Sequence, residues 1–240
     1  MKLQIENISK EYGSKQVLKD LSACFEPGIN AVLGPNGSGK STLINILCGN
    51  LKPDAGTAYW NDTDIIKTPD SFRAALGYVP QTIAMYPEFT EDEYLGYMAV
   101  LKGIARQNRG DEVRRVLQCV SLEKEHRQKT KSLSEGMKRR LLIAQALLGN
   151  PKILIMDEPT AGLDPGQRIL FKKMLLELAK DKIVIFATHI VPDVENIARK
   201  IFFIREGHLV QEEIIQTDAG SYDFMTSLEK RYYSIYGENE

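Results

Sequence analysis

A glycine-rich run near the start of the chain carries the clearest chemical signal in the sequence. It fits the pattern G-x-x-x-x-G-K-[ST] without a mismatch. Its residues are Gly34, Pro35, Asn36, Gly37, Ser38, Gly39, Lys40 and Ser41. Glycines without Cβ atoms let successive backbone N–H groups converge on phosphate oxygens, and a helix that begins there adds positive potential. The run predicts a phosphate-binding loop, with a glycine-rich turn before a capped helix as the alternative.

The residues that end this phosphate loop have side chains suited to a nucleoside triphosphate and its metal. Lys40 is expected to bridge the β- and γ-phosphates, and the Ser41 hydroxyl is expected to bind Mg²⁺. Thr42 can bond a phosphate from the next position. Kinases, GTPases and motor ATPases share such a loop, so the loop alone does not identify the reaction.

Two adjacent carboxylates, Asp157 and Glu158, follow the apolar run Ile153–Met156. A hydrolytic phosphate loop needs a second Mg²⁺ contact and a group that positions water. Because the apolar run predicts a buried strand, we expect both carboxylates at the carboxyl edge of a parallel sheet, where open α/β folds bind ligands. We assign Asp157 to the metal through water and Glu158 to the attacking water as general base. A solvated turn is the alternative, because Asp-Glu-Pro also favours turns.

The elements that must position these groups can be read from the hydrophobic pattern. Short strands are predicted at Leu3–Ile8, Gly28–Leu33, Lys152–Met156 and Lys182–Ala187, and helices at Ser41–Cys48 and Gln167–Lys180. Continuous apolar strands with a helix between them predict a βαβ unit in a parallel sheet that is covered on both faces. The predicted fold class is therefore α/β.

The region from about Glu91 to Leu148 has no comparable strand and predicts several helices, with Gly103, Gly110 and Gly136 as boundaries. We expect a single domain over residues 1–240. Its α/β core covers about 1–85 and 150–216, a helical subdomain covers about 86–149, and a C-terminal helical appendage covers 217–240. The appendage rests on the weak pattern Phe224, Leu228, Tyr232, Ile235.

Composition narrows the possible partners. The 240 residues include 31 Lys and Arg against 32 Asp and Glu, so the net charge of -1 supplies no general attraction to nucleic acid, and none is expected as partner. The three cysteines, Cys24, Cys48 and Cys119, lack metal-binding spacing and are expected to be reduced thiols. No window reaches the ~20 apolar residues that span a bilayer, so membrane-spanning helices, if required, would belong to another chain.

The run Leu133–Arg140 decides among the phosphate-loop proteins. Leu133-Ser134-Glu135-Gly136-Met137 resembles the signature L-S-G-G-Q of ATP-binding cassette (ABC) proteins, followed as in that family by a helix and then the Asp157–Glu158 strand. Glu135 replaces the first signature glycine and Met137 replaces the glutamine. A carboxylate that pointed at a triphosphate would be repelled, so the Glu135 side chain is expected to face away from the nucleotide.

Other loops of the ABC family occur in the same order. The resemblance implies that Tyr12 stacks on adenine, Gln81 contacts Mg²⁺, Asp164 belongs to a dimer loop, and His189 bonds the γ-phosphate and the attacking water. An aromatic that closes the first hairpin, a plain loop glutamine and a packed histidine are the respective alternatives for Tyr12, Gln81 and His189. His126 and His208 fall in no motif and are taken as structural.

The resemblance also implies a fold and partners. The fold would be a P-loop NTPase core with a mostly parallel sheet, an N-terminal antiparallel β region and an inserted helical subdomain. ATP, the substrate, would lie between the phosphate loop of one subunit and Ser134, Glu135, Gly136 and Met137 of another, in a homodimer or paired cassette. Separate transmembrane permease subunits would hold the protein at the cytoplasmic, inner face of the cell membrane, with Tyr86–Phe89 as the receiving surface or as a turn packed under its own subdomain.

The predicted function is therefore ATP hydrolysis coupled to membrane transport. The Gly-Met variant of the signature is most like bacterial exporter ATPases of the antibiotic and lantibiotic export and immunity type. Two alternatives are a non-transport ABC ATPase acting on DNA or ribosomes and a small-molecule kinase. The single compact chain lacks the long insertions or fused cassettes of the first, and a kinase leaves Leu133–Arg140 and His189 unexplained.

Overall fold

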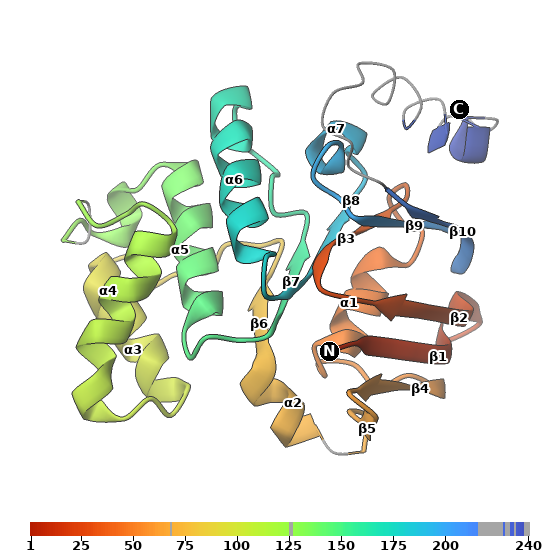
Figure 1. Ribbon diagram of the computed structural model, residues 1–240, viewed down its shortest axis with the longest axis horizontal. Helices are drawn as coiled ribbons and strands as arrows, with labels where there is room; N and C mark the ends of the chain where they lie inside the picture. Colours follow the sequence, from red (N-terminus) through yellow and green to blue (C-terminus); the bar gives the residue numbers. More distant parts are fainter. Residues whose placement is uncertain (68, 125–126, 216–227, 229–230, 233, 238–240) are drawn as a thin grey trace.

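Two β-sheets with helices packed around them form the structure, a computed structural model that describes residues 1–67, 69–124, 127–215, 228, 231–232 and 234–237 (Figure 1). The strands are β1 (Leu3–Tyr12), β2 (Lys15–Phe25), β3 (Gly28–Leu33), β4 (Ala55–Trp60), β5 (Thr63–Asp64), β6 (Leu76–Val79), β7 (Ile153–Asp157), β8 (Ile183–Thr188), β9 (Lys200–Arg205) and β10 (His208–Ile214). The helices are α1 (Lys40–Leu47), α2 (Pro69–Ala75), α3 (Glu91–Leu101), α4 (Arg109–Cys119), α5 (Glu135–Leu147), α6 (Pro165–Leu178) and α7 (Val191–Val194), with short 3₁₀ turns at Arg106–Asn108 and Thr130–Ser132.

The larger sheet places the ends of its parallel strands side by side. Its order is β10-β9-β3-β8-β7-β6, and only β10 pairs antiparallel to its neighbour. Every residue of β7 and β8 is buried, as their continuous apolar sequences predict for strands covered on both faces. We call the side of this sheet where β3, β6, β7 and β8 end the carboxyl edge. The loops that carry Gly34, Gln81, Glu158 and His189 all begin there.

The smaller sheet is antiparallel, in the order β2-β1-β4-β5. The first strand runs to Tyr12, four residues beyond the predicted end, because β1 continues into a hairpin in which Tyr12 pairs with Lys15. The predicted strand Gly28–Leu33 agrees with β3 at both ends, and the predicted helix Gln167–Lys180 begins two residues earlier. The earlier start follows from Asp164, which caps α6 at its N-terminus, and from Pro165 in the first turn.

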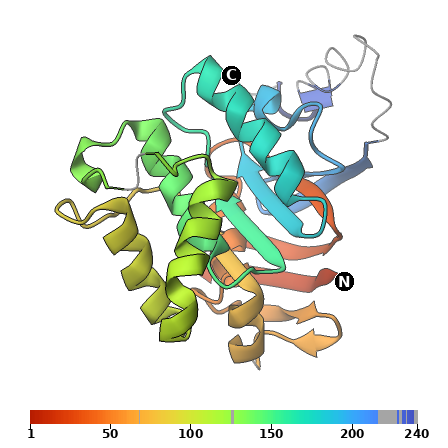
Figure 2. The same cartoon turned by 60° about the vertical axis from the view of Figure 1, so that its left-hand side comes forward.

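Helices α3, α4 and α5, which we call the helical group, lie together at the end of the molecule opposite the antiparallel sheet (Figures 1 and 2). Two of the three glycines expected to separate these helices instead lie inside their first turns: Gly110 in α4 and Gly136 in α5. Ser134, which caps α5, sets that boundary through its side chain. Thus only Gly103, which follows α3, acts as a boundary of the predicted kind.

The helical group packs directly on the sheet. A Cβ atom at Gly77 of β6 would lie 2.4 Å from the Ala146 carbonyl of α5, so the glycine allows the two backbones to approach closely. One cluster of buried side chains includes Leu117 and Leu142 from the helices and Phe186 from β8. The helical group and the sheet therefore share a hydrophobic core.

Most of the predicted C-terminal appendage, including Phe224, lies outside the described residues, as does His126. Of its described residues, Leu228 is 2% exposed, and Tyr232, Ile235 and Tyr236 pack against the main core cluster. The part of the appendage that can be described thus lies on the α/β core.

The structure gives the burial of the three cysteines and the character of the helices it describes. Cys48 is buried, Cys24 is half-buried and Cys119 is exposed, and all three are free thiols. Across the part of the chain that the structure describes, no helix combines the length and apolar character needed to cross a bilayer.

Candidate functional site

The phosphate loop connects the end of β3 to the start of α1. Gly37 and Gly39 have φ angles of 81° and 111°, in the region that glycine adopts readily. At Gly34 a Cβ atom would lie 2.4 Å from the Ile204 carbonyl oxygen and 2.7 Å from Ser38 Oγ. All three glycines are therefore required by the backbone itself, in the region where the sequence predicts phosphate binding.

Lys40 is the buried cation of the loop, with 5% of its side chain exposed. Its ammonium donates to the carbonyl oxygens of Gly34 at 2.8 Å and Pro35 at 3.1 Å, and it lies 3.9 Å from Glu158 Oε1. Burial lowers the pKa of Lys40, and the Glu158 and Asp157 carboxylates oppose that shift. A phosphate group that approached Lys40 would replace neutral carbonyl partners by a negative charge.

Asp157, the last residue of β7, is the buried acid of the site. Burial raises its pKa above the ordinary value, Ser41 and Lys40 act in the opposite direction, and the neighbouring Glu158 adds to the rise. Within the described residues its Oδ1 atom has no hydrogen-bond partner. An unpaired buried carboxylate oxygen beside the Ser41 hydroxyl is a donor set that fits Mg²⁺, which binds oxygen ligands and keeps several waters.

Glu158 and His189 are brought together from two adjacent strands. His189 Nδ1 lies 2.8 Å from Glu158 Oε1, and the Thr188 hydroxyl donates to Glu158 Oε2 at 3.1 Å. The Glu158 side chain is 7% exposed, whereas that of His189 is 44% exposed. Glu158 therefore has fixed partners on its inner side, while the imidazole remains open to an approaching group.

The backbone at Glu158 adopts a left-handed conformation with a φ of 46°, which is rare for a residue with a side chain. Such strained positions cluster at functional sites because the surrounding structure holds them in place. Here the Glu158 N–H donates to the Ala187 carbonyl of β8 at 2.9 Å. This turn directs Glu158 toward Lys40 and His189.

Three further predicted residues lie around these central groups. Gln81 is exposed and follows β6 at the carboxyl edge. Tyr12 is 52% exposed in the β1–β2 hairpin, with the Lys10 ammonium 5.9 Å from its ring centre. Asp164 is exposed and accepts a bond from the Gln167 N–H at 2.8 Å, so its carboxylate caps α6.

The signature residues lie elsewhere, at the start of α5. Ser134 caps this helix by accepting from the Met137 N–H at 3.3 Å. The Glu135 carboxylate pairs with Lys138 at 3.7 Å. Cβ atoms placed on Gly136 and Gly162 would contact the Gln167 side chain and Glu135, respectively. The signature therefore adjoins the loop that follows the acidic pair and the start of α6.

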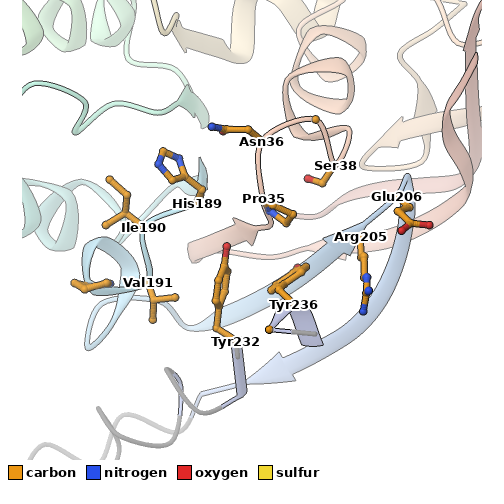
Figure 3. A pocket seen from close by; sticks show the side chains of 13 residues that line it. Pro35, Asn36, Ser38, His189, Ile190, Val191, Arg205, Glu206, Tyr232 and Tyr236 are labelled. Carbon is orange, nitrogen blue, oxygen red and sulfur yellow. The ribbon is translucent and has the colours of Figure 1, made fainter. Parts of the chain in front are cut away.

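A cavity of about 680 Å³ opens on one side of the phosphate loop (Figure 3). Asn36 and His189 lie on one side of it, and Tyr232 and Tyr236 from the C-terminal segment lie on the other. The Tyr236 hydroxyl lies 3.1 Å from the carbonyl oxygens of Leu33 and Ile204, where it can donate to either. The cavity thus includes part of the phosphate loop and His189, whereas Lys40, Asp157 and Glu158 are not among its lining residues.

Sequence reasoning missed two residues of this region. Thr188, which is fully buried, holds Glu158, and Tyr236 supports the strand that leads into the phosphate loop. Thr188 could have been found from the sequence, because it is a polar residue that directly follows an apolar run and precedes His189. The position of Tyr236 depends on a contact with a residue 203 positions away and has no local signal.

Comparison with known proteins identifies relatives over most of the chain. The sequence model of a family described as ABC transporter matches residues 18–161. The chain is 38% identical over 221 residues to the uncharacterized ABC transporter ATP-binding protein YdbJ of Bacillus subtilis (strain 168), which covers 89% of this chain and 70% of that protein. It is 35% identical to the linearmycin resistance ATP-binding protein LnrL of the same organism, over 87% of this chain and 68% of that one. It is also 35% identical to the Nod factor export ATP-binding protein I of Paraburkholderia xenovorans (strain LB400), over 88% and 70%.

Solved structures with the same architecture are ATP-binding cassettes. The dimeric post-hydrolysis state of the cassette MJ0796 bound to ADP and Pi superimposes with a TM-score of 0.79 at 26% identity, covering 89% of this chain and 99% of that one. The ADP conformation of MJ1267 has a TM-score of 0.83 at 27% identity over the whole of both chains. The cbiO1 subunit of the cbiONQ complex from Clostridium perfringens has a TM-score of 0.81 at 28% identity, covering 99% and 91%.

Proposed function

The chain belongs to the ABC transporter family as an ATP-hydrolysing cassette, and we propose that the groups at the carboxyl edge of its sheet are the half-site at which it binds and cleaves ATP. One observation carries this proposal: β3, β7 and β8 bring Lys40, Glu158 and His189 into contact. These residues come from three loops separated in sequence, and all of them follow parallel strands. That convergence is the arrangement expected of a phosphoryl-transfer site.

The phosphate loop would hold the triphosphate through its backbone N–H groups. The residues from Asn36 to Gly39 would provide these donors, and Lys40 would exchange its two carbonyl partners for the β- and γ-phosphates. Thr42 would bond a further phosphate oxygen, and Tyr12 would stack on the adenine. Because burial has lowered the pKa of Lys40, a bound anion would favour its charged form.

Asp157, Ser41 and Gln81 are the residues that would hold Mg²⁺. The hydroxyl of Ser41 would bind it directly, and Asp157 would do so through water, with Oδ1 as the available acceptor. When bound, the metal would neutralise phosphate charge that develops during cleavage. Gln81 would connect this site with the helical group, because its neighbour Pro80 accepts a bond from Arg139 of α5 at 3.1 Å.

Glu158 would orient the attacking water and accept its proton. It can do so because Thr188 and His189 hold both of its carboxylate oxygens in place. With Nδ1 turned toward Glu158, the Nε2 atom of His189 is left for the γ-phosphate or the water. The two residues would therefore act as one unit.

The second half of each site would come from a partner cassette. Within one chain the signature adjoins Gly162 and Gln167, whereas the phosphate loop lies at the carboxyl edge. A dimer in which Ser134, Glu135, Gly136 and Met137 face the partner's ATP would place the N-terminus of α5 against the γ-phosphate. The pairing of Glu135 with Lys138 supports a carboxylate that is turned aside. Asp164 would lie in the same interface.

ATP hydrolysis by the cassette would drive a conformational change in a transmembrane permease. The contact with this permease would hold the cassette at the cytoplasmic face of the membrane. Tyr86–Phe89, which we call the aromatic turn, is a candidate contact, because Tyr86 is 47% exposed and its ring packs on those of Phe89 and Tyr97. The turn is also anchored to its own chain, since the hydroxyl of Thr130, in the 3₁₀ turn before α5, donates to the Tyr86 carbonyl at 2.6 Å. The names of the linearmycin resistance and Nod factor export proteins favour export as the direction of transport.

The test compares wild-type protein with Glu158→Gln. The variant keeps the size of the side chain and removes the base, so ATP binding should persist while kcat falls by roughly 10²–10⁴-fold. Light scattering with and without Mg²⁺-ATP should show a dimer of the variant only when nucleotide is present. A monomer throughout, with hydrolysis undiminished in the variant, would contradict both the base assignment and the shared site.

A further inference from the structure

A buried carboxylate outside the ATP site joins the two loops that carry Glu158 and His189. Asp193 is 1% exposed and lies in α7, four residues after His189. Its Oδ2 atom accepts a bond from the Thr160 hydroxyl, and Thr160 lies two residues after Glu158 and is fully buried. One side chain thus connects the segments that follow β7 and β8.

Arg168 of α6 makes the same connection from the outer side. Its guanidinium pairs with Asp193 Oδ1 at 3.1 Å, and its Nε atom donates to the Leu163 carbonyl at 3.2 Å. The Leu163 N–H in turn donates to the Thr160 carbonyl at 3.1 Å. Asp193 therefore fixes both ends of the loop between Glu158 and Asp164.

Because Asp193 and Thr160 are buried, water could not replace the hydrogen bond between them if it were broken. A carboxylate that loses its partners in a buried position leaves a charge without compensation, so the geometry that preserves its bonds is strongly favoured. The contact of His189 with Glu158 closes the same pair of loops at the site itself. The two strand-end loops are thereby fastened at two points, one at the site and one behind it.

We propose that Asp193 is a positioning residue for hydrolysis, which acts through Thr160 and Arg168 to hold the loop after Glu158 against the loop that carries His189. This inference rests on the proposed function, in which Glu158 and His189 act together on the attacking water. It assigns no contact with ATP to Asp193. Loss of the Asp193 carboxylate or of its bond to Thr160 should therefore reduce kcat and leave the KM for ATP largely unchanged.

The experiment uses Thr160→Val, which keeps the shape of the side chain and removes its hydroxyl, and Thr160→Ser, which restores the hydroxyl. We expect Thr160→Val to lower kcat by about tenfold or more with KM within about twofold, because one bond to a buried charge is lost. Thr160→Ser should recover most of the rate. The double variant Thr160→Val with Asp193→Asn should be no slower than the slower single variant, since both changes cut the same link.

A matched control separates positioning from simple anchoring of α7. Lys172 of α6 donates to the Pro192 carbonyl of α7, so Lys172→Met removes an anchor of this helix and leaves the Thr160 bond in place. Its kcat should stay within about twofold of wild type, with melting temperatures recorded for every variant. Should Thr160→Val fail to fold, Arg168→Gln cuts the network from a side chain that is 30% exposed.

Three results would overturn the proposal: an unchanged kcat in Thr160→Val, an equal loss in Lys172→Met, or effects of Thr160→Val and Asp193→Asn that multiply. The Glu158→Gln protein separates this failure from failure of the proposed function. If that variant forms the ATP-bound dimer and Thr160→Val still hydrolyses at the wild-type rate, only the role of Asp193 is refuted. If it neither loses hydrolysis nor dimerises, both proposals fall.

Discussion

The carboxyl edge and the outer surface of the helical group differ in how their charged residues are held. At the carboxyl edge, Lys40, Asp157 and Glu158 are 4–6% exposed and interact with one another. On and beside the helical group, the side chains of Glu135 in α5 and Glu88 in the aromatic turn are 52% and 65% exposed and pair with lysines at the surface. The edge is organised by contacts between buried charges, whereas these carboxylates lie at the exposed surface. In the proposed dimer, one chain would thus provide a preformed half of a site and a surface that faces a partner.

Mixing two inactive variants tests this division most severely. Lys40→Ala disables the phosphate loop, and Ser134→Ala disables the signature, so each alone should lower hydrolysis by about 100-fold. An equal mixture should recover about a quarter of the wild-type rate, because half of randomly formed dimers are mixed and each mixed dimer holds one intact site of two. Lys180→Ala, at an exposed ion pair, is the control for Lys40. A mixture no more active than its components would show that the two halves act within one chain.

Asp157→Asn should separate stability from function at the carboxyl edge. The variant should lose Mg²⁺-dependent hydrolysis. Without nucleotide, however, it should be more stable than the wild type by about 1 kcal/mol at pH 7, because the buried Oδ1 position of residue 157, which has no hydrogen-bond partner, then belongs to a neutral group. The pKa of Asp157 is raised by burial, so its ionisation destabilises the fold. The free energy of unfolding of the variant should therefore exceed that of the wild type by an amount that grows as the pH rises from about 3.8, the ordinary pKa of the carboxyl. The excess should stop growing once the pH is above the raised pKa of Asp157 in the folded chain. Urea unfolding at several pH values measures this, and a destabilised variant would contradict it.

Alanine at Tyr86 or Phe89 tests the exposed side of the comparison. Hydrolysis by the isolated subunit should remain within about twofold of wild type, since the two rings pack on one another and on Tyr97, while stimulation by the permease should fall by about tenfold. Leu101→Ala, at another exposed apolar residue of the helical group (64%), serves as the matched control. Full stimulation of both aromatic variants would exclude the aromatic turn as the contact.

The smallest effect is expected at Glu88. Hydrogen bonds from Lys129 and Lys131 lower its pKa to about 2. The stability that it contributes is therefore present above about 4.5, its ordinary pKa, and is lost as pH falls toward 2. Glu88→Gln should melt slightly earlier than wild type at pH 7, and the two melting curves should converge near pH 2. A difference in melting temperature that persists at low pH would show that the charge of Glu88 is not its cause.

The sequence predicted those parts of the molecule that depend on local patterns. The phosphate loop, the strand before Asp157 and the presence of a helix at α6 follow from spacing, apolar runs and turn residues, whereas the start of α6 at its Asp164 cap was not predicted. The parallel βαβ unit of β7, α6 and β8 was predicted as well, but its register was not, and it is this register that places Thr188 and His189 against Glu158. The bond between Thr160 and Asp193 likewise joins residues 33 positions apart. Gly110 and Gly136 misled prediction because each lies inside the first turn of a helix; the Ser134 side chain caps the start of α5, whereas α4 begins at Arg109 without a side-chain cap.

The unequal burial of the three cysteines has a practical consequence. Burial raises the pKa of the Cys48 thiol, which keeps it unreactive near neutral pH, and Cys24 is half-covered within β2. The exposed thiol of Cys119 ends α4 in the helical group. A maleimide dye should therefore attach first to Cys119, so that the sequence already carries a site for a spectroscopic label on the helical group.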